Sequence, residues 1–524
     1  MSRLEIASPK RAKIVMEGLY KDLERRIESS PPGLCPVDMA RAFLELCHAQ
    51  TCGKCVPCRI GLGQLNNFIR EVLDGKATMK TLDIMEQTAL SIMESADCAI
   101  GYEAANMVYK GLIGYRDDYI EHIQNGRCTC TYNQPVPCVS LCPAHVDIPG
   151  YIALVGEGRY ADAIRLLRKD NPFPTTCGFI CEHPCEARCR RNMVDDSINI
   201  RGLKRVAADF AGEVDPPQCA PSTGKKIAIL GGGPGGLSAA YYLQLMGHQT
   251  TVYEMLPELG GMLRYGIPNY RLPKERLDDD IRAILKTGVQ VKNGLKIGQD
   301  ITIQELRQQY DVVLITIGAS TDKKLGLENE DADGIISAVQ FLRNVGKNQI
   351  IDLTGKEVVV IGGGNVSMDA VRTAKRLGAK KVSIVYRRRV ADMTALPGEV
   401  EGGVAEGIEL QTLKAPASID VDENHHVKGI YVTPQMVSSI RDGRASIKPT
   451  GEEDIYIPCD VLIVAIGQNI ETHHFEQAGI PVERGKIITK STGAFENLPG
   501  VFAGGDCASG PASVIKAIAA AKVV

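Results

Sequence analysis

The stretch Lys226–Gly236, KIAILGGGPGG, decides the fold of this chain. Its apolar run predicts a buried strand, its glycines predict a tight turn, and the following LSAAYYLQLMG predicts a helix. Gly231, Gly233 and Gly236 have G-x-G-x-x-G spacing. The first glycine permits the turn, the second lets the backbone approach a diphosphate, and the third lets the helix pack close to the strand. N–H groups at the helix N-terminus then face the phosphates.

An acid follows at the position that such a site needs. Glu254 ends the next apolar run, TTVYE, at the distance expected for a carboxylate that binds a ribose hydroxyl. A glycine turn without a ligand is the alternative, but the joint presence of strand, turn, helix and acid argues against it. The residues predicted to hold this nucleotide are Gly231, Gly233, Pro234, Gly236 and Glu254.

A second nucleotide fold begins at Lys356. KEVVVIGGGNVSMDAVRTAKRLGAKKVSIVYRRR repeats strand, turn, helix and strand, with Ser367 in the place of the third glycine. In this unit the second strand is followed by arginines, whereas the second strand of the first unit ends in Glu254. A carboxylate favours a free ribose 2′-hydroxyl, whereas guanidinium groups favour a 2′-phosphate through bidentate contacts. We therefore expect FAD in the first site and NADP(H) in the second, although an arginine run can also be a solvated face. The predicted NADP(H) residues are Gly362, Gly364, Asn365, Arg387, Arg388 and Arg389.

Composition limits the remaining possibilities. The 524 residues correspond to about three or four domains. A net charge of −3 gives no electrostatic case for nucleic acid or an anionic membrane. The N-terminus has no apolar signal region, and no run approaches the ~18 apolar residues of a membrane span. We expect a soluble, cytoplasmic protein. No catalytic acid or base is predicted, because hydride transfer to a flavin requires alignment rather than proton transfer.

The cysteines point to metal ligation. Of 17 cysteines, 14 lie between Cys35 and Cys189, in a chain too long for a secreted disulfide scaffold. TCGKCVPCRIG places three of them in C-x2-C-x2-C spacing, and a single cysteine follows much later. Three cysteines on one tight loop with a fourth far along the chain favour a [4Fe–4S] cluster. Structural zinc more often takes two separated pairs and remains the alternative, together with uncoordinated thiols. The predicted ligands are Cys52, Cys55, Cys58 and Cys98.

A second cysteine block follows. Its first half has C-x-C-x7-C-x3-C spacing and ends in Cys-Pro, and its second half is CGFICEHPCEARC. A Cys-Pro after C-x3 is typical of ferredoxins, in which the last cysteine serves the other cluster. Two interleaved clusters are therefore expected, with zinc ligands or spare thiols as the alternative. The segment between the halves predicts two short helices.

Two family resemblances extend these predictions. FLELCHAQTCGKCVPCRIG, with Cys98, resembles the C-terminal cluster domain of the NADH-binding flavoprotein subunit of respiratory NADH dehydrogenase, which also occurs in bifurcating hydrogenases. NPFPTTCGFICEHPCEARC, followed by INIRGLKR, resembles the two-cluster domain of the small subunit of NADPH-dependent glutamate synthase. The same domain is found in dihydropyrimidine dehydrogenase and in the large subunit of NADH-dependent ferredoxin:NADP transhydrogenase.

The second resemblance implies ligand sets for the second block. One cluster would use Cys138, Cys189 and the pair Cys128 and Cys130, and the other would use Cys142, Cys181 and Cys185. Two departures stand out. The family's first half usually reads C-x2-C-x4-C-x3-C, and its usual Glu or Gln ligand corresponds here to Lys204. Because an ammonium cannot ligate, the second of these clusters has another fourth ligand or is incomplete, so two to three [4Fe–4S] clusters are expected in the chain.

The same resemblance implies flavin contacts beyond the glycine turn. Asp506 would bind the ribitol chain, and a helix opening at about Ala512 would face the flavin pyrimidine. The chain stops inside that helix, so we expect a truncated C-terminus. The positions implied by the resemblance are Gly260, Gly261, Arg264, Gly318, Gly505, Asp506 and Ala512.

We therefore predict a multidomain fold in which all-α iron–sulfur domains precede two Rossmann-like α/β nucleotide-binding domains. The expected boundaries are 1–125 for the first cluster domain, 126–222 for the second, 223–350 and 471–524 for FAD, and 351–470 for NADP(H).

The resemblances imply an oxidoreductase subunit that moves electrons between NADP(H), FAD and an iron–sulfur chain. The domain combination favours an electron-bifurcating NADP/NAD/ferredoxin transhydrogenase, an inference by analogy. Its partners would be an FMN- and NADH-binding flavoprotein subunit and a small iron–sulfur subunit, with ferredoxin as a further candidate. The alternatives are the small subunit of glutamate synthase, a related NADPH:acceptor oxidoreductase, and a non-catalytic assembly scaffold.

Overall fold

The computed structural model describes residues 12, 14–21, 35–126, 136–187, 189–193, 195–349, 351–441 and 444–524. These residues belong to two compact units. The first unit is Met1–His145 with His183–Ile200, and the second is Val146–Glu182 with Arg201–Val524.

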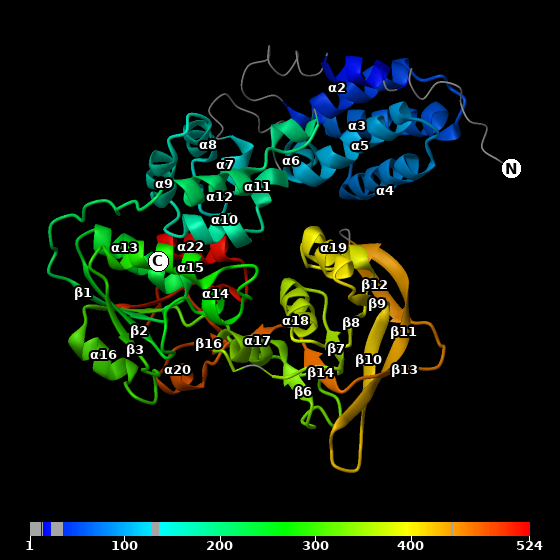
Figure 1. Cartoon of the computed structure of the whole chain (residues 1–524). Helices are drawn as coiled ribbons and strands as arrows, with labels where there is room; N and C mark the ends of the chain where they lie inside the picture. Colours follow the sequence, from blue (N-terminus) through cyan, green and yellow to red (C-terminus); the bar gives the residue numbers. More distant parts are fainter. Residues whose placement is uncertain are drawn as a thin grey trace. The chain divides into compact units, whose positions relative to one another are not determined.

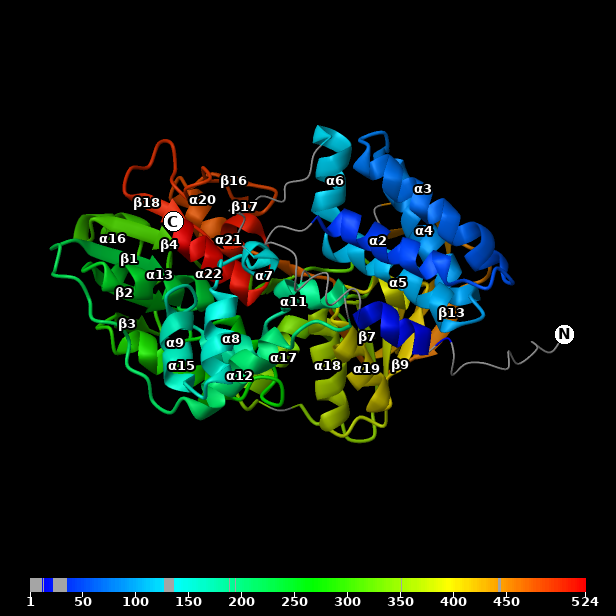
Figure 2. The same ribbon diagram turned by 90° about the horizontal axis from the view of Figure 1, so that it is seen from above.

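The first unit is helical. Its long helices, drawn blue to cyan in Figures 1 and 2, pack around a shared apolar core that includes Phe43, Leu65 and Val108. Local signals set their ends, because Thr78 and Thr81 form a capping box before α4 and left-handed Gly126 follows α6. The helices are α2 (Pro36–Ala49), α3 (Leu62–Leu73), α4 (Met79–Ser95), α5 (Ala99–Gly114), α6 (Arg116–Asn125), α7 (Pro137–Leu141) and α11 (Pro184–Ala187), with a π turn at Pro57–Gly61 and a 3₁₀ turn at Arg190–Met193.

The second unit begins with a small helical layer. The predicted pair of short helices is confirmed as α8 (Ile148–Gly156) and α9 (Tyr160–Arg168), which lie side by side in Figures 1 and 2. They are followed by α10 (Pro174–Ile180) and α12 (Ile200–Phe210).

The predicted strand, turn and helix at Lys226–Leu245 are confirmed within an all-parallel sheet of order β18-β4-β1-β2-β3. Ile229 of β1 lies between Val252 and Leu314 of its two neighbours. The chain order reverses at β1, and ligands of such sheets bind at the carboxyl ends of strands beside this reversal. The strands are β1 (Lys226–Leu230), β2 (Gln249–Glu254), β3 (Gln290–Asn293), β4 (Val312–Ile315) and β18 (Val501–Ala503), and the helix after β1 is α13 (Pro234–Leu245).

A second parallel sheet has order β6-β14-β7-β8-β9 and the same reversal, at β7. An antiparallel sheet joins it along the chain. The elements are β6 (Ile335–Ser337), β7 (Glu357–Ile361), α18 (Asn365–Arg376), β8 (Lys381–Tyr386), α19 (Pro397–Ala405), β9 (Glu409–Thr412), β10 (Lys414–Val421), β11 (Val427–Arg441), β12 (Arg444–Pro449), β13 (Ile455–Pro458) and β14 (Val461–Val464).

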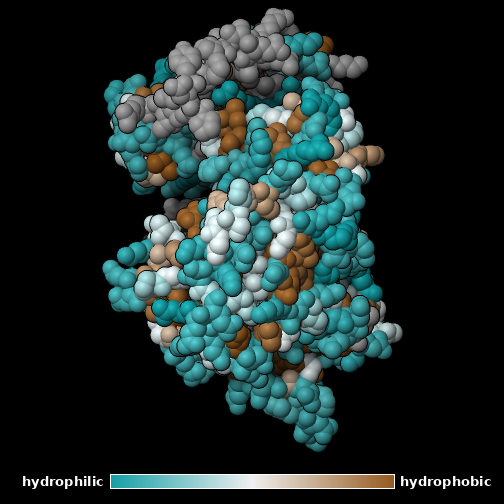
Figure 3. Space-filling model, turned by 90° about the vertical axis from the view of Figure 1, so that its left-hand side faces the viewer, coloured by the Kyte–Doolittle hydropathy of each residue, from teal (hydrophilic) through white to brown (hydrophobic). Residues whose placement is uncertain are grey.

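Short elements complete the second unit. They are α14 (Met262–Tyr265), α15 (Lys274–Leu285), α16 (Ile303–Gln309), β5 (Thr321–Asp322), α17 (Ala338–Gly346), a 3₁₀ turn (Val390–Asp392), β15 (Gln468–Asn469), α20 (His473–Gln477), β16 (Val482–Glu483), β17 (Lys486–Ile487), α21 (Asp506–Ser509) and α22 (Val514–Val523). Figure 3 shows a face on which hydrophilic side chains dominate and apolar ones form small patches. No helix built from the described residues is long and apolar enough to cross a membrane.

Candidate functional site

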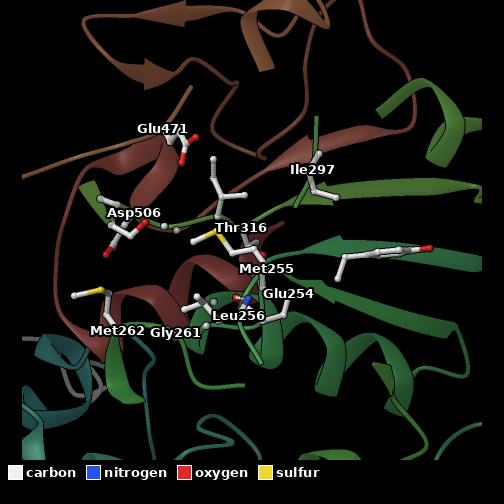
Figure 4. A pocket seen from close by; sticks show the side chains of 18 of the residues that line it. Glu254, Met255, Leu256, Gly261, Met262, Ile297, Thr316, Glu471 and Asp506 are labelled. Carbon is white, nitrogen blue, oxygen red and sulfur yellow. Dashed lines mark hydrogen bonds between the residues drawn. The ribbon is translucent and has the colours of Figure 1, made fainter. Parts of the chain in front are cut away.

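The first cavity lies at the carboxyl edge of the first sheet. The turn after β1, the ends of β2 and β4 and the segment around Asp506 form its walls. Figure 4 shows Asp506, Glu254 and Gly261 around the same space. The predicted residues that line it are Gly231, Gly233, Pro234, Glu254, Gly261, Gly318, Gly505 and Asp506.

The glycine turn fits the backbone of a diphosphate. Gly231 has a φ of +111°, and a Cβ there would lie 2.6 Å from the carbonyl oxygen of Thr316. A Cβ on Gly236 would lie 2.0 Å from the carbonyl oxygen of Gly231, so no other residue allows this packing of helix on strand. Beside Gly233 the nearest atom to a Cβ would be the Cα of Gly261 at 3.9 Å, an ordinary contact, so no protein atom crowds the helix N-terminus at this position.

Glu254 is held in place by the backbone. Its Oε2 accepts the N–H of Gly232 at 2.7 Å, and its Oε1 accepts that of Leu256 at 2.8 Å. Burial raises the pKa of this carboxyl, and the two backbone hydrogen bonds oppose the rise. Each carboxylate oxygen can accept more than one hydrogen bond, so the group can also bind ribose hydroxyls.

Asp506 closes the cavity from the C-terminal segment. Burial raises the pKa of its carboxyl, and the backbone N–H of Ala512 opposes this effect. Ala512 itself lines a different cavity. The last helix begins at Val514, two residues later than expected, because Ser513 is extended with φ −88° and ψ 159°.

Besides Ala512, three residues predicted for the flavin site do not line this cavity. Gly236 packs against the turn, and the N–H of Gly260 donates to the carbonyl of Gly232 at 2.8 Å, which supports the turn from behind. The guanidinium of Arg264 donates to the carbonyl of Leu259 at 2.6 Å and pairs with Asp278. Arg264 therefore shapes the loop around the cavity.

Other lining residues lie outside the predicted set. Lys296 Nζ lies 2.8 Å from Glu471 Oε1, and Arg343 Nη2 donates to the carbonyl of Ser320 at 2.7 Å. His474 also lines the cavity. Lys296 and Glu471 lie in loops, Arg343 lies in α17 and His474 lies in α20. Only the folded chain brings these residues together, and no local motif marks them.

The second cavity lies at the carboxyl edge of the second sheet. A Cβ on Gly362 would lie 2.3 Å from the carbonyl oxygen of Ala465 and 2.4 Å from Ser367 Oγ. Ser367 therefore packs where the third glycine of the motif would be. The predicted residues that line this cavity are Gly362, Gly364, Asn365, Arg387, Arg388 and Ala512.

Of the three arginines after β8, two line the second cavity and one does not. Arg387 and Arg388 line the cavity, and Arg388 Nε donates to the carbonyl of Ala445 at 3.1 Å. Arg389 does not line it, because its guanidinium binds both carboxylate oxygens of Asp392 at 2.8 and 3.0 Å. This pairing lowers the pKa of Asp392 to about 2. Arg389 therefore stabilises the turn after β8.

The four cysteines of the N-terminal motif lie together. Burial raises the pKa of the Cys58 thiol to about 12, and Cys55, Cys98 and Cys52 add to the effect. Gly101 makes room for this sulfur, because a Cβ there would lie 2.7 Å from Cys58 Sγ.

No group of three or more His, Cys, Asp or Glu side chains in the described part of the chain is arranged to hold a single metal ion. A [4Fe–4S] cubane instead binds each thiolate to a different iron. Cys58 is buried, Cys55 and Cys98 are half-buried and Cys52 is exposed, so such a cluster would lie at the edge of the helical core. Metal binding would supply the energy that forms the thiolates.

The second cysteine block is described in part. Cys128 and Cys130 lie outside the described residues. In the first unit, burial raises the pKa of the Cys138 thiol, and the nearby Cys189 and Cys142 raise it further. Cys185 belongs to that unit as well, whereas Cys181 belongs to the second unit.

Lys204 is buried in the second unit. Its ammonium lies 5.9 Å from the centroid of the Tyr151 ring. Burial raises the pKa of the nearby Cys177 thiol, and the charge of Lys204 opposes this rise. Cys177, which was not among the predicted ligands, is fully buried and its sulfur lies 3.8 Å from Asn171 Oδ1. An ammonium has no lone pair to give to iron, so Lys204 in its charged form is not a cluster ligand.

Comparisons with known proteins identify three regions. Residues 225–521 match the family described as pyridine nucleotide-disulphide oxidoreductase. Residues 38–122 match the NADH-ubiquinone oxidoreductase-F iron–sulfur binding region. Residues 114–215 match the dihydropyrimidine dehydrogenase domain II, 4Fe-4S cluster.

Curated relatives align with large parts of this chain. The NADP(+)-dependent formate dehydrogenase subunit beta of Moorella thermoacetica is 32% identical, over 91% of this chain and 77% of its own length. The NADPH-Fe(3+) oxidoreductase subunit beta of Geobacter sulfurreducens is 34% identical, over 93% and 77%. The glutamate synthase [NADPH] small chain of Escherichia coli is 34% identical, over 73% and 85%.

Both predicted resemblances are thus confirmed, as are the predicted cofactors FAD, NADP(H) and [4Fe–4S] clusters. The chain belongs to the pyridine nucleotide-disulphide oxidoreductase family, as an NAD(P)H-dependent oxidoreductase that also carries two iron–sulfur regions.

Proposed function

We propose that this chain is the NADP(H)-handling subunit of a larger electron-transfer complex and connects two-electron to one-electron chemistry. One observation carries the proposal. The lining of the second cavity includes Arg387 and Arg388, which follow β8, as well as Pro511–Ser513. The latter segment follows α21, which begins at Asp506, and Asp506 lines the first cavity. A dinucleotide anchored by its 2′-phosphate would therefore reach toward the flavin with its nicotinamide end.

The chain's own residues would bind and align the two cofactors. When bound, FAD supplies hydride acceptance from NADPH and single-electron release to iron–sulfur clusters. Glu254 and Asp506 would hold its ribose and ribitol hydroxyls, and the glycine turn would face its diphosphate. The arginines at the end of β8 would hold the 2′-phosphate of NADP(H).

The proposed site assignments follow from these roles. For FAD they are Gly231, Gly233, Pro234, Gly236, Glu254, Gly260, Gly261, Gly318, Gly505 and Asp506, with Arg264 shaping the loop, and for NADP(H) they are Gly362, Gly364, Asn365, Arg387, Arg388 and Ala512. For the clusters they are Cys52, Cys55, Cys58 and Cys98 in one set, and Cys128, Cys130, Cys138, Cys142, Cys181, Cys185 and Cys189 in the other. We retain the domain boundaries predicted from the sequence as part of this proposal.

The relatives support an exit for electrons through the N-terminal cluster. Two relatives that align over more than nine-tenths of the chain are beta subunits of a formate dehydrogenase and of an Fe(3+) oxidoreductase. The glutamate synthase small chain aligns over 73% of the chain. We therefore favour a complex whose partner subunit receives electrons from the N-terminal cluster over a glutamate synthase.

An electron-bifurcating transhydrogenase is the finer proposal. It is supported by the union of a cluster region of NADH dehydrogenase type with a flavoprotein of glutamate synthase type. Its partners would be an FMN- and NADH-binding flavoprotein subunit and a small iron–sulfur subunit. In the purified complex, ferredoxin reduction by NADPH should then require NAD⁺. Ferredoxin reduction without NAD⁺ would contradict bifurcation, and NADPH-dependent reduction of CO₂ to formate would select a formate dehydrogenase.

The core proposal has a direct test. The purified chain should contain flavin and iron, its visible absorbance should bleach when NADPH is added without oxygen, and EPR should then detect reduced iron–sulfur clusters. A chain without bound flavin, or one that does not bleach, would contradict the proposal.

A further inference from the structure

One carboxylate lies among cationic side chains in the second cavity. Among the described residues that line this cavity, Glu182 is the single acidic one, and Lys323, Arg387, Arg388 and Lys516 are cationic. A cavity for a polyanion is expected to carry positive charge. A carboxylate there repels the phosphates, so its presence suggests a contact with a cationic or hydrogen-donating part of the ligand.

Glu182 is held at the glycine turn by Asn365. The backbone N–H of Leu396 donates to Asn365 Oδ1 at 3.0 Å. Because a backbone N–H can only donate, this bond fixes which end of the amide is the acceptor. Asn365 Nδ2 then donates to Glu182 Oε1 at 3.2 Å. The carboxylate therefore lies beside the first residue of α18, where the diphosphate is expected.

The adenosine half of the nucleotide is a poor partner for this carboxylate. Arg387 and Arg388, which line the cavity, would hold the 2′-phosphate. Pro511–Ser513 also line this cavity, and they follow Asp506 of the first cavity by a few residues, so the nicotinamide half would lie toward this segment. That half offers ribose hydroxyls, a carboxamide and, in the oxidised form, a positively charged ring.

Resting on the proposed function, we propose that Glu182 contacts the nicotinamide half of the bound nucleotide and favours its oxidised form. The pyridinium ring of NADP⁺ carries a charge that NADPH lacks, so a carboxylate next to it stabilises NADP⁺ selectively. Preference for the oxidised nucleotide favours electron flow from NADPH into the protein.

Glu182 is the sequence neighbour of a proposed cluster ligand. It directly follows Cys181, a proposed cluster ligand that is buried, and Arg201 Nη1 donates to the Cys181 carbonyl at 3.2 Å. One short segment thus supplies both a proposed cluster ligand and a wall of the nucleotide cavity.

The test compares the affinities of three ligands for the oxidised, cofactor-loaded chain by isothermal titration calorimetry. The ligands are NADP⁺, 1,4,5,6-tetrahydro-NADP, whose neutral ring cannot give hydride, and adenosine 2′,5′-bisphosphate, which lacks the nicotinamide half. Glu182→Gln should weaken NADP⁺ about tenfold and change the other two less than about twofold. Glu182 is exposed, so the substitution should not disturb folding.

Glu157→Gln is the matched control. Glu157 follows α8 on the surface, pairs with Arg159 and should leave the binding of all three ligands unchanged. Unchanged NADP⁺ binding, tighter NADP⁺ binding or equal weakening of all three ligands in Glu182→Gln would each overturn the inference. If the unsubstituted chain bound none of the three, the proposed function would fail instead, so the two failures are distinct.

Discussion

Arg271 binds both carboxylate oxygens of Asp369, with its Nη1 2.7 Å from each. The two side chains are 11% and 6% exposed. Arg271 precedes α15, beside the first nucleotide fold, and Asp369 lies in α18, which starts at the second glycine turn. Glu399 of α19 adds a contact at 3.2 Å to Arg271 Nε. The pair therefore ties the two nucleotide-binding regions together.

Arg271→Met should destabilise the chain strongly. The substitution leaves Asp369 without its main cation in a buried site, and breaking a buried ion pair from one side costs about 3–5 kcal/mol. Urea unfolding of the cofactor-loaded chain measures this loss. Arg282→Met is the control, because Arg282 is 63% exposed, pairs with Asp279 and should cost less than about 1 kcal/mol. Similar losses for both variants would show that the buried pair contributes little.

Much of the nucleotide-binding architecture could be predicted because its signals are local. The turn at Gly231 needs a positive φ and close backbone packing, and both requirements restrict the sequence to glycine. Glu254 follows one strand later, so its distance along the chain is set by one helix and two loops. Arg271 and Asp369 are 98 residues apart, and nothing in either local sequence predicts their pairing.

Gly236→Ala should abolish flavin retention. The new Cβ would lie 2.0 Å from the Gly231 carbonyl oxygen, so either α13 or the turn must move. Overpacking of this kind costs about 1–3 kcal/mol and displaces the diphosphate-binding N–H groups. The flavin absorbance per chain after purification measures retention.

Gly235→Ala is the matched control in the same helix turn. The nearest atom to its Cβ would be 3.9 Å away, an ordinary contact, and its backbone N–H is kept. Full flavin content in Gly236→Ala, or equal loss in both variants, would contradict the packing argument.

Gly101→Ala should remove the N-terminal cluster. Its Cβ would lie 2.7 Å from Cys58 Sγ, which must then leave its position among the other thiols. We expect a loss of about four irons per chain, with flavin content unchanged. Gly63→Ala is the control in α3, because no atom lies within 4 Å of its added Cβ. Iron retention in Gly101→Ala would argue against a cluster at these cysteines.

Asp280 should make stability depend on pH. Backbone N–H groups of Thr175 and Thr176 donate to its carboxylate at 3.3 and 2.7 Å, and burial raises its pKa to about 6. The unfolded value is about 3.9, so the folded chain holds this proton more tightly. The resulting stability is fully present below about pH 4 and is lost as pH rises through about 6.

Asp280→Asn removes this titration. Relative to that variant, the unsubstituted chain should gain about 1 kcal/mol of unfolding free energy between pH 7 and pH 5. Urea unfolding at both pH values measures the difference. A difference that does not change with pH would contradict the raised pKa.

The residues missed in the site share a physical reason. Lys296 and Glu471 meet across the first cavity at 2.8 Å, although each lies in a loop whose path depends on tertiary packing. Arg389 was predicted to bind nucleotide with its two neighbours, but the 3₁₀ turn at Val390–Asp392 brings Asp392 back onto it. Charge and spacing predicted where phosphate could bind, and side-chain pairing decided which arginines remain in the cavity.

Arg388→Ala should weaken NADPH far more than NADH. Arg388 lines the second cavity, and the loss of a charge-assisted contact to the 2′-phosphate costs about 1.5–3 kcal/mol, a factor of roughly 10 to 100. NADH lacks that phosphate and should change less than about threefold. KM values with an artificial electron acceptor measure both. Arg389→Ala removes a guanidinium that Asp392 already binds, so it should affect the two nucleotides alike. Equal losses for NADPH and NADH in Arg388→Ala would remove the 2′-phosphate assignment, because only NADPH carries the group that this arginine is proposed to bind.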